Sequence, residues 1–455
     1  MRRAPAVVPA LAAVLLLSGC TSFVIGRAES GRSGSTTPGD VTVVGAADDP
    51  VDDRARDALA DLETYWADVF PDVYGRQFQP LQGGYFSVDP DDVDPRDYPD
   101  GVGCGQQPVA VESNAFYCQA PNAPHSDSIS YDRSFLAELA DGYGQFIPAL
   151  VMAHEFGHAI QARVGAPSAS IAIETQADCL AGTWTRWVAE GKAEHSRLEA
   201  PELDELLRGY LLLRDPVGTG TAAESAHGSY FDRVSAFQEG FDGGAAACRD
   251  DFGPGRTFTQ GEFTTDTDFR RQGNAPYQEV RTVIEESLPE FWQRAFDEVF
   301  GKPFRPPTLD AFRGTAPDCA EEDRDLVYCP DGDVVGYDET DLALPALELG
   351  DFAVLTAVAI PYALAARDQL GLPVEGDDAL RSAVCLTGWY SAQVYNGTLE
   401  SVEISPGDLD ESVQFLLTYG LEPQVLGEAD LTGFQLVDLF RGGFVEGVGP
   451  CDVGA

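Results

Sequence analysis

The residues best suited to chemistry in this sequence are His154 and His158, with Glu155 directly after the first of them. On a helix, positions four residues apart share a face, so both imidazoles can reach one metal ion. Glu155 is then placed to act as general base on a water molecule held by that ion. The spacing therefore predicts a hydrolytic zinc site.

Two acidic residues follow further along the chain, at Glu174 and Asp178. Glu174 is the candidate third ligand, which would leave a fourth position for water, as in catalytic zinc sites. Asp178 lies one helical turn later and can accept the second N–H of a ligand histidine, which fixes its tautomer. We expect one Zn²⁺ per chain, held by His154, His158 and Glu174.

Chance is a poor explanation of the His-Glu-x-x-His pattern. The chain has only five histidines in 455 residues, and at such frequencies the pattern is expected about 0.004 times. The stretch before it, 149–153, is apolar, as a buried active-site helix would be. The alternative is an ordinary helix that carries two surface histidines and binds no metal, and it explains the pattern less well.

The elements that must position these residues are helices. Apolar periodicity predicts one helix over 135–164, which carries the histidines, and one over 172–191, which brings Glu174 towards them. Further helices are expected over 55–70, 202–214 and 230–241.

Short strands are expected over 83–88 and 126–132. Glycine and proline residues interrupt the stretch from Cys104 to Cys118, which predicts a loop or hairpin closed by a disulfide. A small sheet beside a mainly helical bundle is an α+β fold.

The N-terminus has the features of an export signal. Two arginines precede the apolar run 4–17, which ends in Leu17-Ser18-Gly19-Cys20. This order resembles bacterial lipoprotein signals, in which the signal is removed and the cysteine is lipidated; an ordinary secretory signal is the alternative. We expect residues 1–20 to be a signal peptide, Cys20 to be lipidated and 21–50 to be a flexible tether.

The formal net charge is −46. Such a charge argues against nucleic acid as a partner and against electrostatic docking on anionic lipid. The expected partners are a peptide or protein substrate and, through the N-terminal lipid, the extracytoplasmic face of the cell membrane.

The sequence contains an internal repeat. Residues 65–80 read YWADVFPDVYGRQFQP and residues 291–306 read FWQRAFDEVFGKPFRP. The correspondence continues in order, without a gap from 131 to 191. Colinear landmarks over a domain-sized unit predict two tandem copies rather than a solenoid. The expected boundaries are a peptidase domain over 51–250, a linker over 251–274 and a degenerate domain over 275–455.

The cysteines follow the same repeat. Eight remain after Cys20, and an even number in an exported chain favours disulfides. Each copy has four at matching places, so pairing within a copy is the simplest arrangement. The expected bonds are Cys104–Cys118, Cys179–Cys248, Cys319–Cys329 and Cys385–Cys451.

The second copy has lost the chemistry. In the repeat register, the five residues of the proposed site are replaced as a group by Ile360, Pro361, Leu364, Leu380 and Val384. Apolar side chains can fill the space that a metal would otherwise hold. Pro361 removes one helical N–H, so a kink or interruption is expected there.

Several segments of the first copy resemble one protein family. WADVFP, FYC, SYD, HEFGHAIQ, ETQADCLAG and HGSYFDRVSAFQEGF occur in the order of the neutral zinc metallopeptidases of bacteria, over roughly residues 55–250. The resemblance implies a zincin-like fold with a glutamate third ligand, as in thermolysin. The chain departs from the pattern at Ala159, where many relatives carry a further histidine, and in its second copy. The implied roles are metal ligand for His154, His158 and Glu174, base for Glu155, and support of a ligand for Asp178.

His227 is the candidate donor to the oxyanion of a tetrahedral intermediate, because His227-Gly228-Ser229 matches the family's His-Gly pair. A packing or capping role is the alternative. Tyr131 and Tyr230 are rival donors, although buried tyrosines are more often structural. Arg233 could equally pair with an acidic neighbour.

Together these features predict an exported, membrane-anchored zinc metallopeptidase that hydrolyses peptide bonds. Two alternatives stay open. One is a non-catalytic zinc-binding lipoprotein that acts as scaffold or binding module. The other is a zinc-dependent amidase acting on cell-wall peptides.

Overall fold

The structure is a computed structural model that describes residues 41–320 and 323–454. The signal peptide and Cys20 lie outside the described residues. By their contacts, the described residues belong to one unit, which consists of two halves. The first half contains β1 (Val43–Val44), α1 (Pro50–Tyr74), β2 (Gly84–Val88), β3 (Ala115–Cys118), β4 (Ser128–Asp132), α2 (Arg133–Tyr143), α3 (Ile147–Val164), α4 (Ser170–Ala189), α5 (Ala200–Leu213) and α6 (Tyr230–Asp250).

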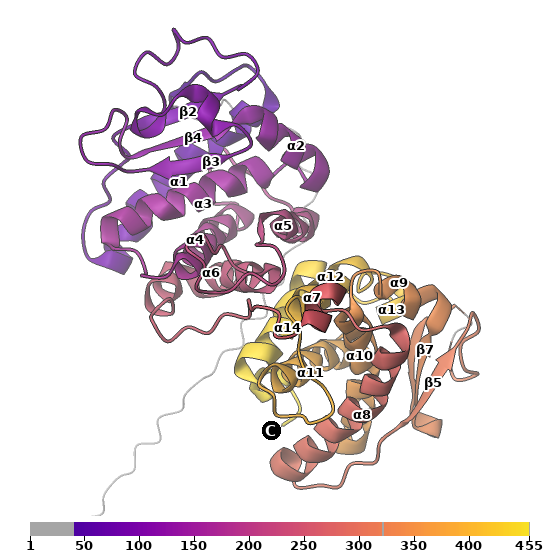
Figure 1. Ribbon diagram of the computed structural model, residues 1–455. Coiled ribbons are helices and arrows are strands. Elements are labelled where there is room, and N and C mark those ends of the chain that lie inside the picture. The colour runs from indigo at the N-terminus through magenta and orange to yellow at the C-terminus, as the bar shows by residue number, and fades with distance from the viewer. Residues whose placement is uncertain (1–40, 321–322, 455) are drawn as a thin grey trace, which may run out of the picture. The chain divides into compact units, whose positions relative to one another are not determined.

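The first sheet has the strand order β1-β2-β4-β3. β2 runs parallel to β4, whereas β3 pairs antiparallel with β4 and forms one edge of the sheet. Every residue of β4 is buried, and α3 packs on β3 and β4. Figure 1 shows these strands beside α1 and α3. The sheet thus supports the helix that carries the two histidines.

Two expectations for the first half need correction. The single helix expected over 135–164 is two helices, because Gly144 at φ +99° ends α2. The tether expected over 21–50 ends earlier than predicted. Val43 and Val44 pair with β2, and Asp49 caps α1 by accepting hydrogen bonds from the backbone of Val51 and Asp52, both at 2.9 Å.

Helix α4 is held tightly against α6. A Cβ atom on Gly240 would overlap the carbonyl of Cys179, so only glycine permits this approach. The disulfide Cys179–Cys248 joins the same two helices. The other three bonds, Cys104–Cys118, Cys319–Cys329 and Cys385–Cys451, also join the pairs expected from the repeat.

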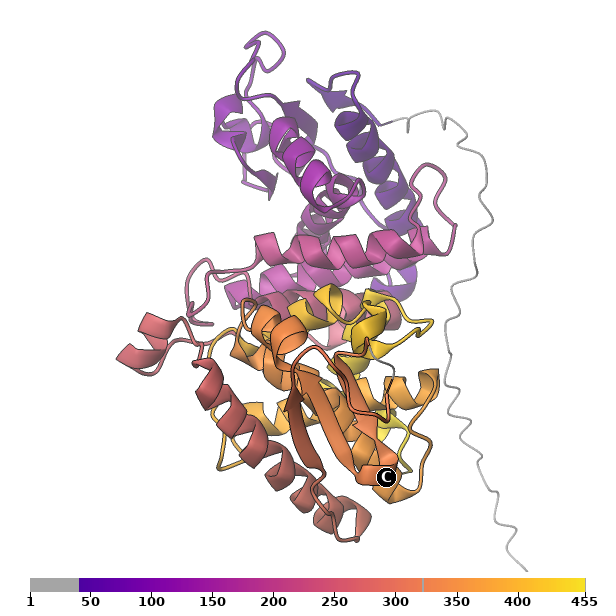
Figure 2. The same ribbon diagram turned by 90° about the vertical axis from the view of Figure 1, so that its right-hand side faces the viewer.

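The second half has a similar order of elements. It contains α8 (Tyr277–Ala295), β5 (Thr308–Phe312), β6 (Leu326–Cys329), β7 (Val334–Asp338), α9 (Leu344–Ala346), α10 (Asp351–Leu370), α11 (Asp377–Tyr395), α12 (Asp408–Thr418), α13 (Pro423–Leu426) and α14 (Gly433–Glu446). β5 runs parallel to β7 and β6 antiparallel to it, which repeats the relation of β2 and β3 to β4. Figure 2 shows these strands side by side.

The expected interruption of α10 at Pro361 does not occur. The helix continues from Asp351 to Leu370 with the proline inside it. Most of this helix is buried, and it packs on α8, α11 and α12. Tertiary packing on several sides outweighs the one missing hydrogen bond.

The linker expected over 251–274 is not wholly irregular, since it contains the short helix α7 (Asp266–Arg271). Beyond it, the halves contact each other through helix ends. Asp204 on α5 accepts a hydrogen bond from the backbone of Phe434, at 2.7 Å, at the start of α14. Asp410 on α12 accepts one from the backbone of Phe231, at 2.9 Å, at the start of α6. Each half therefore caps a helix of the other.

Aromatic rings of the two halves contact each other in the same reciprocal manner. The ring centroids of Phe231 and Phe440 lie 6.2 Å apart, and those of Phe237 and Phe434 lie 6.4 Å apart. The α+β class expected from the sequence is confirmed. Among the described residues, no helix combines the length and apolarity needed to cross a bilayer.

Candidate metal centre

Helix α3 brings the two histidines together. His154 and His158 lie one turn apart, and their Nε2 atoms are 3.2 Å from each other. Residues before them, from Ile147 to Ala153, are buried, so the apolar side of the helix anchors it in the core. The polar side faces a cavity of about 800 Å³.

Helix α4 adds Glu174. Its Oε2 atom lies 3.3 Å from Nε2 of His154 and 3.6 Å from Nε2 of His158. The two helices can approach because residue 157 is glycine: a Cβ there would lie 2.9 Å from the Cα of Ala177. The structure thus brings together the three residues that the sequence predicted as ligands.

These three residues fit a zinc ion. Their candidate ligand atoms all lie within 4.8 Å of one another, and two imidazole nitrogens with one carboxylate oxygen are a donor set typical of catalytic zinc. Burial by itself lowers the pKa of His154, but the carboxylates of Asp178 and Glu174 outweigh it and raise that pKa to about 10. A proton must therefore leave this histidine when a metal binds.

Asp178 orients the first histidine. Its Oδ1 lies 2.9 Å from Nδ1 of His154, which leaves Nε2 to face the cluster. Arg233 on α6 donates two hydrogen bonds to this carboxylate, each at 2.8 Å. Burial tends to raise the pKa of Asp178, but the charges of Arg233 and His154 lower it. The carboxylate is therefore kept ionised.

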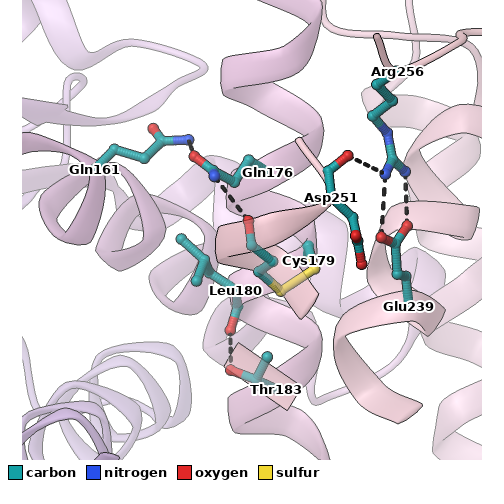
Figure 3. The surroundings of a disulfide bond; sticks show 9 residues. Gln161, Gln176, Cys179, Leu180, Thr183, Glu239, Asp251 and Arg256 are labelled. Carbon is teal, nitrogen blue, oxygen red and sulfur yellow. Dashed lines mark hydrogen bonds and ion pairs between the residues drawn. A yellow bond between two sulfur atoms is a disulfide. The ribbon is translucent and has the colours of Figure 1, made fainter. Parts of the chain in front are cut away.

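A chain of amides orients the second histidine. Oε1 of Gln161 lies 2.9 Å from Nδ1 of His158. The amide nitrogen of Gln161 donates to Gln176 at 3.0 Å, and that of Gln176 donates to the carbonyl of Cys248 at 2.9 Å. Figure 3 shows both glutamines beside the Cys179–Cys248 disulfide. The disulfide and the metal centre are thus linked by three hydrogen bonds.

Glu155, the candidate general base, lies beside the three candidate ligands. Its side chain is 7% exposed, and its Oε2 accepts a hydrogen bond from the backbone of Tyr117 on β3 at 2.7 Å. Burial raises the pKa of Glu155, which favours proton transfer at a pH closer to neutral. The residue lines the same cavity as the three candidate ligands.

The structure separates the candidate oxyanion donors. His227 lines the cavity, and its Nδ1 lies 3.3 Å from Oδ1 of Asp215. Tyr131 and Tyr230 do not line it: their hydroxyls donate to Asp52 at 2.6 Å and to the carbonyl of Leu207 at 2.8 Å. Among the three, only His227 lies on the wall of this cavity.

Sequence reasoning did not identify Gln161, Gln176 or Tyr117 as parts of this site, and it left the partner of Arg233 open. The position of Gln161, three residues after His158, was a usable signal, because such residues are neighbours on a helix. Gln176 and Tyr117 carried no such signal, since their contacts depend on tertiary packing.

Comparisons with known proteins agree with this geometry. The family model described as "Putative neutral zinc metallopeptidase" matches residues 7–252, more than half of the chain, and stops before the second half. An uncharacterized protein of Escherichia coli K12, YpfJ, is 29% identical over 175 residues, which are 34% of this chain and 58% of the relative.

Two mycobacterial proteins are also similar. Mb2605 of Mycobacterium bovis and Rv2575 of Mycobacterium tuberculosis H37Rv, both uncharacterized, are each 30% identical over 105 residues, 21% of this chain and 35% of theirs. The chain thus spans little more than half of the length of the Escherichia coli relative and about a third of the mycobacterial ones. No solved structure matches the chain.

Proposed function

This chain belongs to the neutral zinc metallopeptidase family, and on that premise we propose that it hydrolyses peptide bonds at the centre formed by His154, His158 and Glu174. The observation that carries the proposal is the convergence of these ligand atoms beside the buried carboxylate of Glu155, on the wall of a large cavity. One zinc ion per chain is the proposed cofactor.

Zinc, when bound, supplies a Lewis acid that makes water more acidic and polarises a carbonyl. Glu155 accepts a proton from the attacking water and later delivers it to the leaving nitrogen, which balances the two proton transfers. The backbone N–H of Tyr117 holds this carboxylate by its Oε2. His227 is the proposed donor to the oxyanion, with Asp215 holding its Nδ1.

The substrate proposed for this cavity is an extended peptide. Strand β3 is an edge of the first sheet, and its residues Ala115, Phe116 and Tyr117 line the cavity. An extended segment can add to such an edge through backbone hydrogen bonds. Side chains from Leu150, Val151 and other apolar residues are available to contact it.

Zinc analysis together with cleavage of a random peptide library tests this function. We expect one zinc per chain and cleavage by the wild type. Glu155→Gln should keep zinc and lose about 10³-fold in rate, whereas Glu138→Gln, an exposed change on α2 of the same half, should keep both. An active Glu155→Gln protein would refute the role of this residue.

The two alternative functions give different results in this experiment. Zinc binding without any turnover would favour a scaffold or binding module. Cleavage confined to cell-wall peptides, with ordinary peptides left intact, would favour an amidase.

We further propose that the chain is exported and held at the extracytoplasmic face of the membrane by a lipid on Cys20. The supporting feature is the order of basic residues, apolar run and Leu17-Ser18-Gly19-Cys20. Labelling of cells with a radioactive fatty acid should mark the wild type but not Cys20→Ser. Label on the Cys20→Ser protein would contradict the proposal.

The second half is, in this proposal, a degenerate copy that lacks the zinc ligands. The similar order of elements and the matching strand pairings support it. Its proposed role is to stabilise the first half through the contacts that α12 and α14 make with α5 and α6.

A further inference from the structure

Three carboxylates meet in the second half, far from the histidines in sequence. Asp351 is the first residue of α10, and Asp408 and Glu411 lie in the first turn of α12. One oxygen atom from each lies within 4.8 Å of the others. Asp408 is 3% and Glu411 is 5% exposed, so this cluster is largely withdrawn from water.

Each of the three carboxylates uses one oxygen for a local hydrogen bond. Oδ2 of Asp351 accepts from the backbone of Ala275 and Oδ2 of Asp408 from that of Ser405, both at 2.7 Å. Oε2 of Glu411 accepts from the backbone of Phe352 at 2.8 Å. These bonds orient the side chains and leave one oxygen of each for another partner.

Two of the three remaining oxygens are buried without a partner. Oδ1 of Asp408 is buried and accepts no hydrogen bond from any residue that the structure describes, and the same holds for Oδ1 of Asp351. A buried carboxylate oxygen without a donor is costly and rare in folded proteins. Something outside the described chain is therefore needed to satisfy these atoms.

No basic side chain neutralises the cluster. Within residues 41–320 and 323–454, none of the three carboxylates forms an ion pair with a lysine, arginine or histidine. Arg214, which is close enough to influence the charge of Glu411, is paired with Asp410 at 2.6 Å. Several buried negative charges in contact require either protons or a cation.

The backbone makes room for this arrangement. Gly350, just before α10, has φ +144°, and a Cβ atom there would overlap the carboxylate of Glu411. A cavity of about 870 Å³ adjoins the cluster and is lined by Asp351 and Asp408. Water from this cavity can complete the coordination of an ion.

We propose that Asp351, Asp408 and Glu411 form a calcium site. All three candidate ligands are carboxylate oxygens, which are hard donors preferred by Ca²⁺, whereas zinc favours nitrogen and sulfur. Ca²⁺ takes six to eight oxygens in flexible geometry, so three carboxylates and several waters suit it. The site is separate from the zinc centre and does not depend on the proposed catalysis.

The first half provides an internal control. There Gly144 lies against the carboxylate of Glu205 in the same manner, but the next residue is Gln145 instead of an aspartate. The amide of Gln145 donates to the carbonyl of Ala140 at 3.2 Å. No cluster of three ligand atoms is found here among the described residues, so we expect no calcium at this place.

Calcium binding by the intact chain tests the proposal. After removal of calcium with EGTA, equilibrium dialysis should find one Ca²⁺ per chain, and added Ca²⁺ should raise Tm by about 3 °C. The double change Asp408→Asn and Glu411→Gln should abolish both effects. Glu205→Gln should leave both unchanged, and the zinc content should be the same in all three proteins.

Two outcomes would contradict the proposed calcium site. A wild type that binds no Ca²⁺ and shows no shift in Tm would mean that protons neutralise the cluster. A double variant that still binds one Ca²⁺ would place the ion elsewhere. Should the double variant not fold, Asp351→Asn alone provides the comparison, with a loss of calcium affinity of at least about tenfold expected.

Discussion

The two halves of the chain share an order of elements and differ most where the helix pair α3–α4 corresponds to α10–α11. In the first half, the facing side chains are His154, His158 and Glu174. At the matching positions of the second, Ile360 is 1% and Leu380 is 8% exposed. These apolar residues line a smaller cavity of about 480 Å³, against about 800 Å³ in the first half.

What the halves keep in common is the packing of their helices. A Cβ atom on Gly240 would overlap the carbonyl of Cys179, and one on Gly443 would overlap that of Cys385. A disulfide joins the helix pair in both cases. Close helix approach and a disulfide therefore belong to the scaffold of both halves, whereas the cluster of His154, His158 and Glu174 occurs, among the described residues, only in the first half.

Transfer of one residue from the second half to the first should have the largest effect. His158→Leu copies Leu364 and removes one of three ligands, so zinc should be lost and peptide cleavage should fall by about 10³-fold or more. Metal analysis and the cleavage rate measure both losses. Leu364→Ala is the matched change in the second half and should alter neither zinc content nor cleavage. Retention of zinc and activity by His158→Leu would contradict the assignment of His158 as a zinc ligand.

Removal of either long disulfide should lower the stability of the chain, but only one of the two removals should affect zinc binding. Cys179–Cys248 closes 69 residues and Cys385–Cys451 closes 66. Replacing either pair by alanine should lower the free energy of unfolding by about 4 kcal/mol, as measured with urea. Only the first replacement should also weaken zinc binding, because Gln176 bonds the carbonyl of Cys248. Equal zinc affinities in the two variants would disprove the link.

Loss of the charge that orients the first histidine should have a smaller effect. Asp178→Asn keeps the shape of the side chain but weakens its hold on His154, so zinc affinity should fall about 10- to 100-fold. Competition with a chelator measures the change. Val384→Ala, at the matching position in α11, should leave zinc affinity as it is; an unchanged affinity in Asp178→Asn would argue against the orienting role.

The reciprocal helix caps should give the smallest differences. Asp204→Ala and Asp410→Ala should each lower the free energy of unfolding by about 1 kcal/mol, with the second somewhat larger because Asp410 also pairs with Arg214. Urea titration of the two variants measures whether their losses of unfolding free energy are nearly equal. A large loss in one and none in the other would show that the two caps are not equivalent.

Local patterns sufficed for some of these features and not for others. The spacing of His154 and His158 places them on a shared face of any helix. The repeat reduced the possible disulfide pairings to those within each copy. The end of α2 at Gly144 did have a local signal, because a glycine followed shortly by Pro148 is typical of a helix end, but the apolar pattern that runs on through 135–164 masked it. The pairing of Arg233 with Asp178 joins residues 55 positions apart, which no local pattern reveals.

The caps that Asp204 and Asp410 provide have a geometric consequence. When a residue of one half meets a partner in the other, and the equivalent residues meet in exchange, the interface is isologous, as in a two-fold symmetric dimer. The exchange extends to the phenylalanine pairs 231–440 and 237–434. The intramolecular interface therefore has the form of a homodimer contact within a single chain, although its two partners differ in sequence.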